Sequence, residues 1–294
     1  MSQQHAQSAP CSEWAHILDG YSVEVTTRDA RSLSQVQPIL PSGTEVFIAA
    51  LPKEKPARQV EMAVELRALG HVPVPHIVAR HISHVADLDA LLARLVREAG
   101  VDRALVLGGD RDTPAGAFDS ALQLIETGLF ERHGIRRLSI SAYPEGHPRI
   151  SDSELDRART DKLLQAEACG LSMDLVSQFC FDAAPIVAFA ERLQSEGCKA
   201  RLRVGIAGPA DRATLIKYAM ICGVGPSLRA LKERQALTRS LLSGETPERL
   251  LSELAQARRQ KPDLPISGIH FFTFSSLAES VTWAADCLKR SRAA

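Results

Sequence analysis

The sequence predicts a single-domain (β/α)8 barrel, and two observations carry that prediction. Short apolar, β-branched runs alternate eight times with longer segments whose apolar residues recur three and four positions apart, which indicates repeated strand–helix units. The chain has 294 residues, which suits a barrel whose typical size is about 250 residues. A doubly wound open sheet is disfavoured because no Gly-x-Gly-x-x-Gly follows the first strand: Gly223-Val-Gly225 lacks the third glycine and follows a helix.

The strand–helix units can be placed in order along the chain. The expected strands are Tyr21–Thr27, Thr44–Ala50, Val72–Pro75, Arg103–Leu107, Arg137–Ala142, Leu175–Gln178, Arg201–Ile206 and Ile266–Phe272. The expected helices are Arg58–Leu69, Asp87–Ala99, one from about Phe118, one opened by Ser151, Ala184–Glu196, Asp211–Ile221, Pro247–Gln260 and Leu277–Leu288.

Capping residues support several of these boundaries. Asp87 is expected to begin one helix and Gly100 to end it, while Ser151 with Glu154 three residues later forms a capping box. The segment Gly223–Pro247 fits no simple unit, and we expect an extra helix there over one barrel end. No Gly/Ser tract, Pro-rich run or block of one charge interrupts the chain, so we expect one domain over 1–294 with a short N-terminal extension at about 1–19.

The charge balance excludes partners held by bulk electrostatics. Thirty-five Lys and Arg stand against thirty-five Asp and Glu, which argues against nucleic acid and anionic membranes as partners. No stretch reaches the ~20 apolar residues of a membrane helix, and Met1–Pro10 is polar, without an apolar signal core. We therefore expect a cytoplasmic protein whose six scattered cysteines are reduced.

A carboxylate lies inside the first predicted strand. The two-residue period places Glu24 on the face opposite Val23 and Val25, where it either lines the barrel mouth or forms an ion pair at an edge. A buried carboxylate costs several kcal/mol unless it is paired or protonated. Burial also raises its pKa, as a general acid at neutral pH requires, so Glu24 is a candidate catalytic acid.

Other polar residues stand at predicted strand ends, where barrel enzymes place their active sites. His76 follows the third strand, and Asp110 follows a glycine pair after the fourth, as a ligand acceptor or as a plain turn residue. The loop 143–148 (Tyr-Pro-Glu-Gly-His-Pro) combines an aromatic ring, a carboxylate and an imidazole. Gln178 ends the sixth strand with an amide that can both donate and accept toward a heterocycle.

Three common kinds of catalytic site find no support. His76, His81 and His84 do not have the spacing of metal ligands, so we expect no metal. The sequence contains neither a nucleophile elbow nor a phosphate loop ending in Gly-Lys-Ser/Thr.

Together these residues resemble the methylenetetrahydrofolate reductases. The Tyr143–Pro148 loop and the run Gln178-Phe179-Cys180-Phe181-Asp182 are the specific motifs. Weaker matches occur in the family's order and cover most of the chain: Val23-Glu24-Val25, Pro75-His76-Ile77, Gly109-Asp110 and His270-Phe271-Phe272-Thr273.

The resemblance implies a barrel that holds FAD and uses NAD(P)H to reduce 5,10-methylenetetrahydrofolate to 5-methyltetrahydrofolate. It makes Glu24 the general acid toward the folate, Asp110 a catalytic residue near the flavin and the pterin, and Gln178 a pterin contact. It also implies flavin contacts from His76, Gly109, Tyr143 and His147. We expect a homo-oligomer with a tetrahydrofolate derivative as substrate.

The chain departs from the family at the cofactor side. Gly108 stands where the family usually has an arginine, and a usually Lys-rich helix retains only Arg157, Arg159 and Lys162. We therefore expect weak, reversible FAD binding. Two alternatives remain: direct hydride transfer from NAD(P)H without FAD, and a folate- or flavin-binding subunit of a methyl-transfer or electron-transfer complex.

Overall fold

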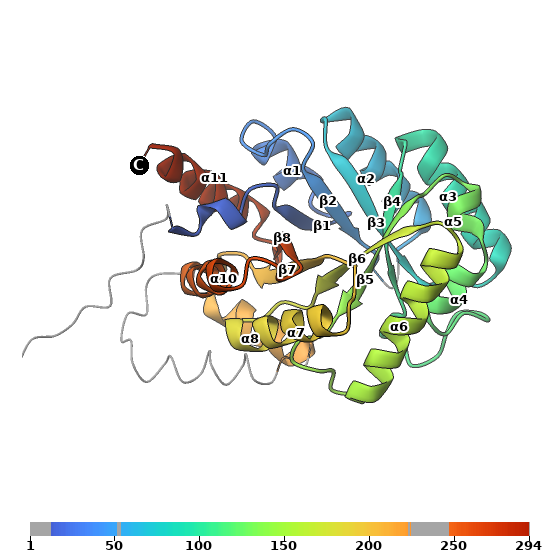
Figure 1. The fold of residues 1–294 in the computed structure, drawn as a ribbon. Helices are drawn as coiled ribbons and strands as arrows, with labels where there is room; N and C mark the ends of the chain where they lie inside the picture. The colour runs from blue at the N-terminus through green and yellow to red at the C-terminus, as the bar shows by residue number, and fades with distance from the viewer. Residues whose placement is uncertain (1–12, 52–53, 223, 225–246, 294) are drawn as a thin grey trace, which may run out of the picture.

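The computed structural model describes residues 13–51, 54–222, 224 and 247–293, which form a closed barrel of parallel strands (Figure 1). The strands follow chain order around the barrel, and the last pairs back onto the first. This confirms the predicted (β/α)8 fold. The strands are β1 (Ser22–Thr26), β2 (Glu45–Ala49), β3 (Val72–Val78), β4 (Arg103–Leu107), β5 (Arg137–Ala142), β6 (Ser172–Ser177), β7 (Leu202–Ala207) and β8 (Ile266–Phe272).

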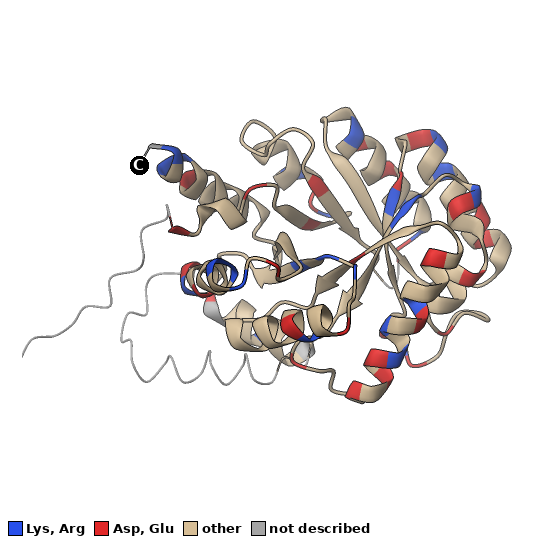
Figure 2. Cartoon of the chain, viewed as in Figure 1, with Lys and Arg blue, Asp and Glu red and all other residues tan. Residues whose placement is uncertain are grey.

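Helices cover the outside of the barrel, and Figure 2 shows acidic and basic residues interspersed along α3 and α6. The main helices are α1 (Ala30–Val36), α2 (Pro56–Ala68), α3 (Val85–Ala99), α4 (Ala121–Glu126), α5 (Leu129–Arg132), α6 (Asp152–Ala168), α7 (Ala183–Ser195), α8 (Arg212–Ile221), α10 (Glu248–Gln260) and α11 (Leu277–Ala293). Two short 3-10 helices are η2 (Ala15–Ile17) and η3 (Ala79–His81).

The capping predictions are confirmed in part. Gly100 ends α3 in the left-handed conformation at φ 58°, and the Ser151 hydroxyl and the Glu154 carboxylate form the predicted capping box of α6. The predicted start of α3 is wrong by two residues. His84 is the N-cap, and Asp87 lies one turn inside, where its carboxylate accepts the His84 N–H at 3.0 Å.

Other elements differ from the sequence-based expectation. The helix expected from about Phe118 is two short helices, α4 and α5, separated at Gly128, whose φ is 69°. The sequence analysis missed α1, a seven-residue helix that buries only Leu33 and Val36 and so shows little periodicity. The extra helix expected within Gly223–Pro247 lies almost entirely outside the described residues.

Charged side chains close the N-terminal end of the barrel. Glu45 of β2 forms ion pairs with Arg103 of β4 and with Arg203 of β7, the latter at 2.9 Å. Arg137 of β5 lies 3.8 Å from both Glu45 and Asp174. Above this layer Phe47, Val74, Leu105 and Val176 form a small apolar core. These described residues fill the N-terminal half of the barrel, so the candidate site lies at the C-terminal ends of the strands, where this fold carries its active sites.

Candidate active site

Glu24 projects into the barrel from the middle of β1. Val23 and Val25 are fully buried against the surrounding helices, so the alternation of the strand turns Glu24 to the opposite face, beside Phe47 of β2. Its side chain is 22% exposed. The Thr273 hydroxyl just after β8 donates to the Glu24 carbonyl oxygen at 2.8 Å, which ties the two ends of the sheet together at this residue.

Burial raises the pKa of the Glu24 carboxyl to about 7, and the negative Asp29 carboxylate adds to the effect. Asp29 is held beside the strand end because it accepts the Thr26 N–H at 2.7 Å and the Thr26 hydroxyl at 2.8 Å. A carboxyl with this pKa is about half protonated at neutral pH, which is the condition for general acid catalysis.

His76 faces the Glu24 carboxyl from within β3, which runs to Val78, so the prediction that the strand ends at Pro75 and His76 follows it is wrong. The His76 Nε2 atom lies 3.7 Å from Glu24 Oε2. Burial lowers the pKa of His76 to about 3, so the imidazole is neutral at physiological pH. The Gln59 side-chain amide fixes this part of β3, donating to the His76 carbonyl at 3.0 Å and to the Ile48 carbonyl at 3.2 Å.

Rings form a continuous wall from the barrel lumen towards its mouth. The Phe47 ring lies 6.2 Å from His76 and 4.6 Å from His270, and His270 lies 5.0 Å from Phe272. The wall continues through Phe274 to Tyr218 of α8, whose ring stacks on Phe274 at 4.3 Å. Such a surface suits a planar heterocycle, which can stack or pack edge-on against it.

This wall of rings was not predicted from the sequence. Period-two alternation alone places His270 and Phe272 on the same face of β8, but their approach to Phe47 depends on closure of the barrel. The bulky Phe274 has a φ of 46° and Ser275 a φ of 69°. These are conformations that non-glycine residues seldom adopt, so the turn after β8 is strained where the wall ends.

Gln178 comes directly after β6, and the oxygen of its side-chain amide is already in use. Its Oε1 atom accepts the Phe179 N–H at 3.0 Å, and its backbone N–H donates to the Ala142 carbonyl at 2.8 Å. This arrangement orients the side-chain NH2 group away from the backbone and leaves it as a donor for a ligand.

Position 205 of β7 requires a glycine, because the end of β6 passes too close for a side chain. A Cβ atom on Gly205 would lie 2.2 Å from the Ser177 carbonyl oxygen and 2.6 Å from the Phe272 ring. The Ser177 hydroxyl accepts the Gly205 N–H at 2.8 Å, which fixes the strand end that carries Gln178.

Tyr143 and His147 follow β5 as an edge-to-face pair with ring centroids 5.1 Å apart. Burial raises the pKa of the Tyr143 phenol, while burial and the nearby Arg149 lower the pKa of His147. Gly109 and Asp110 are exposed in the loop after β4. No hydrogen bond or ion pair within the described residues joins the Asp110 carboxylate to Glu24, so these two predicted catalytic residues are not in contact.

The cations after β3 and on α6 differ in their availability. Arg80 reaches the loop after β4 but is held by Asp119, with an ion pair at 2.6 Å and a hydrogen bond to its carbonyl at 3.1 Å. On α6, Arg157 is exposed, whereas Lys162 is half-buried and desolvation lowers the pKa of its amine. No ion pair of Lys162 occurs within the described part of the chain.

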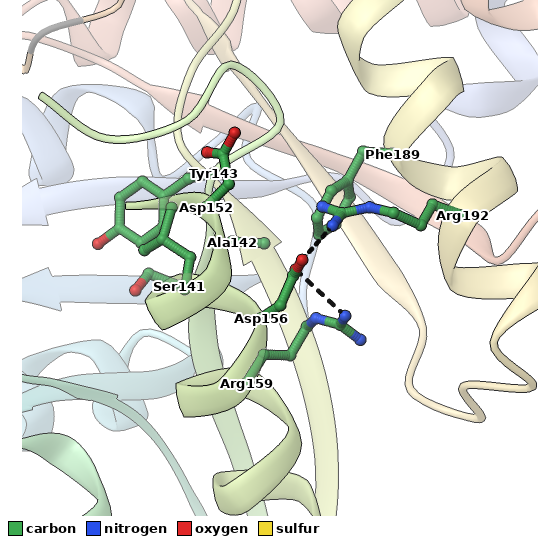
Figure 3. Close-up of a pocket in the computed structure, with 9 residues that line it drawn as sticks. Ser141, Ala142, Tyr143, Asp152, Asp156, Arg159, Phe189 and Arg192 are labelled. Atoms are coloured by element: carbon green, nitrogen blue, oxygen red, sulfur yellow. Dashed lines mark hydrogen bonds and ion pairs between the residues drawn. The ribbon is translucent and has the colours of Figure 1, made fainter. Parts of the chain in front are cut away.

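Figure 3 shows a separate hollow between the end of β5, α6 and α7. Its charges neutralise one another: the Asp156 carboxylate lies 2.5 Å from Arg192 and 3.3 Å from Arg159, and Arg159 also pairs with Glu196 at 2.7 Å. Arg159 is therefore not free to hold a ligand's phosphate. The hollow is lined by Ser141, Ala142, Tyr143, Asp152, Leu155, Asp156, Arg159, Phe189 and Arg192.

Two further searches cover the described residues only. No group of three or more His, Cys, Asp and Glu side chains there is arranged to hold a metal ion. None of the described helices has the length and apolar character needed to cross a membrane.

The fold and the site define a TIM barrel with an acid–imidazole pair and an aromatic wall at its mouth. Comparison with known proteins gives the fold relatives of this chain, although no family model matches it. A protein from Clostridium thermocellum, described as binding two copies of 5-methyl-5,6,7,8-tetrahydrofolic acid, is similar with a TM-score of 0.59 at 14% identity, over 92% of this chain and 94% of that one.

A second solved structure is a putative phosphonomutase from Burkholderia cenocepacia. It is similar with a TM-score of 0.50 at 12% identity, over 93% of this chain and 94% of that one. At these identities both likenesses show the barrel fold. The chain is thus a TIM-barrel protein structurally similar to a methyltetrahydrofolate-binding protein.

Proposed function

We propose that this protein is a methylenetetrahydrofolate reductase, which uses NAD(P)H and bound FAD to reduce 5,10-methylenetetrahydrofolate to 5-methyltetrahydrofolate. The observation that carries the proposal is the Glu24 carboxyl, with a pKa of about 7, at the foot of a wall of rings in the barrel mouth. The folate ligand of the Clostridium thermocellum barrel supports the same substrate class.

Glu24 is the general acid in this proposal. Its protonated carboxyl donates to a nitrogen of the five-membered ring, which opens to an electrophilic iminium, and hydride addition to the iminium carbon gives the methyl group. The carboxylate that remains sits in a desolvated site and takes up a proton again readily, because its pKa is close to neutral.

The pterin is recognised by the free NH2 group of Gln178 and by the aromatic wall. Asp110, which is exposed in the loop after β4, would approach both the pterin and the flavin. FAD would lie against His76, Gly109, Asp110, Tyr143 and His147.

The residues present fit FAD at one charged position. Lys162 is a desolvated amine without an ion pair among the described residues, and a pyrophosphate would supply its counter-charge. When bound, FAD would carry hydride from NAD(P)H to the folate. Few other cations are available to the phosphates, because Gly108 offers no side chain and Arg159 is already paired with Asp156 and Glu196. We therefore expect reversible FAD binding.

A second candidate function is hydride transfer from NAD(P)H to the folate without FAD, and the same shortage of free cations favours it. A third, a folate-binding subunit without a reductase cycle, is favoured by the Clostridium thermocellum barrel, which is described only as binding its folate.

One assay separates the three. Purified protein is mixed with NADH or NADPH and 5,10-methylenetetrahydrofolate, with and without added FAD, and 5-methyltetrahydrofolate is measured. FAD-dependent product supports the proposal, FAD-independent product supports direct transfer, and folate binding without product supports the third function.

The variant Glu24→Gln tests the assigned acid. Loss of a positioned general acid typically lowers the rate by about 10²–10⁴, or roughly 3–5 kcal/mol of barrier. Oxidation of NAD(P)H by an artificial acceptor should survive, because that half-reaction needs no proton delivered to folate. Folate reduction within a few-fold of wild type would show that Glu24 is not the acid.

A further inference from the structure

The imidazole of His76 is buried with an unused hydrogen-bonding atom. The side chain is 8% exposed. Its Nε2 atom is buried and has no hydrogen-bond partner among the described residues. Buried polar atoms nearly always have a partner, and an unpaired one calls for an explanation.

Among the described residues, the Glu24 carboxyl is the charged group that pairs with this atom across a short gap, with Oε2 3.7 Å from Nε2. A movement of about 0.8 Å brings the two atoms to the ordinary hydrogen-bond distance. The Glu24 side chain can make that movement, because its carboxyl accepts no hydrogen bond within the described residues. The Thr273 hydroxyl holds only the Glu24 backbone carbonyl.

We propose that His76 is the positioning residue for Glu24: the neutral imidazole bonds the carboxyl through Nε2 in both of its protonation states, by changing tautomer. When Glu24 is protonated, its O–H donates to Nε2 and the ring proton is on Nδ1. When Glu24 is ionised, Nε2–H donates to the carboxylate, and the Nδ1 proton has left to water. The ring carries one proton in both states, so its charge does not change.

The surrounding charges favour a neutral ring over an imidazolium. Burial lowers the pKa of His76 and of His270, its neighbour on the lumen side, and Arg203 below His270 adds positive charge to the same region. Among the described residues, Asp29 and Cys222 are titratable groups whose charge couples to that of Glu24. The Cys222 thiol stays protonated, because burial and the Glu24 charge raise its pKa to about 11. His76 is thus the neighbour able to donate or accept at physiological pH.

This inference rests on the proposed role of Glu24 as an acid and adds a consequence for it. A hydrogen bond to an ionised carboxylate is about twice as strong as one between neutral groups. His76 therefore stabilises the ionised form more, which makes Glu24 a stronger acid than burial alone would allow. It also aims the carboxyl at one position in the mouth.

The first test uses nitrogen-15 NMR of the wild-type protein, which needs neither substrate nor cofactor. The chain has nine histidines, and the signals of His76 are those lost in His76→Phe, or in His76→Asn if the Phe variant does not fold. We expect Nδ1–H at pH 5 and Nε2–H at pH 9, with the midpoint at the pKa of Glu24. A single tautomer across this range, or an imidazolium near pH 6, would overturn the proposal.

The second test measures the Glu24 pKa in three variants by the infrared absorption of the protonated carboxyl, identified by its absence in Glu24→Gln. The donor at the Nε2 position is absent in His76→Phe and in His76→Asn. We expect each variant to raise the Glu24 pKa by about one, which is a tenfold higher affinity of the carboxylate for its proton. His76→Gln places an amide NH2 near the same position and should restore the wild-type value. An unchanged pKa in the Phe and Asn variants would refute the role. If the protein shows these pKa shifts but reduces no folate, the proposed function is refuted and the positioning role of His76 stands.

Discussion

The pKa of Glu24 predicts how its replacement by glutamine changes stability with pH. A carboxyl whose pKa rises from 4.5 when unfolded to about 7 when folded binds its proton more tightly in the folded state. The folded protein therefore loses stability as pH rises from 4.5 through 7 and loses no more above that range. The full effect of such a rise is about 3 kcal/mol. Because the side chain is 22% exposed, solvent screening reduces the expected effect to about 2 kcal/mol.

Glu24→Gln keeps the shape of the neutral carboxyl and cannot ionise. We expect the free energy of unfolding of this variant to equal that of the wild type below pH 4.5 and to exceed it by about 2 kcal/mol at pH 8 to 9. The assay is urea unfolding followed by circular dichroism at five pH values. Glu167→Gln, at an exposed position on α6, is the matched control and should show no such difference. A Glu24→Gln curve parallel to that of the wild type would refute the raised pKa.

Four further predictions follow from the described geometry. Gly108→Arg should fold normally, because a Cβ there comes no closer than 3.9 Å to another residue, and should tighten FAD binding by about one decade in a flavin fluorescence titration. Gly109→Ala is its control and should destabilise the protein, since Gly109 has a φ of 100° and a Cβ would lie 2.6 Å from a neighbouring side chain. Lys162→Ala should weaken FAD binding while leaving folate binding unchanged; equal FAD affinity would remove Lys162 from the site. Gln178→Glu keeps the acceptor and loses the donor, so calorimetry should show 5-methyltetrahydrofolate binding about tenfold weaker. Burial holds the pKa of His270 well below its usual value, so stability should fall as pH drops below 6.5, and the slope should be shallower in His270→Gln.

The sequence was sufficient to predict the barrel because the periodicity of its elements is local. The Gly100 and Ser151 caps are also local signals, since each depends on the few residues around it. The start of α3 was predicted wrongly and the break at Gly128 was not predicted. In both cases the backbone conformation of a single residue decides the boundary, extended at His84 and left-handed at Gly128, and hydrophobic periodicity does not report it.

The position of Glu24 could be predicted from strand alternation, but its surroundings could not. Its contact with His76 joins β1 to β3, and the wall of rings joins β2 to β8 and α8, so both depend on the register of the closed sheet. The sequence likewise could not separate Lys162 from Arg159 on α6. The distinction arises because Glu196, beyond the end of α7, pairs with Arg159.

A crystal structure of the protein with 5-methyltetrahydrofolate is the decisive experiment for the proposed site. We expect one pterin in the barrel mouth, against the rings of Phe272 and Phe274, with the Glu24 carboxyl and the Gln178 NH2 group within hydrogen-bond distance of it. A folate bound only outside the mouth, or no bound folate at millimolar concentration, would show that the mouth is not a folate site.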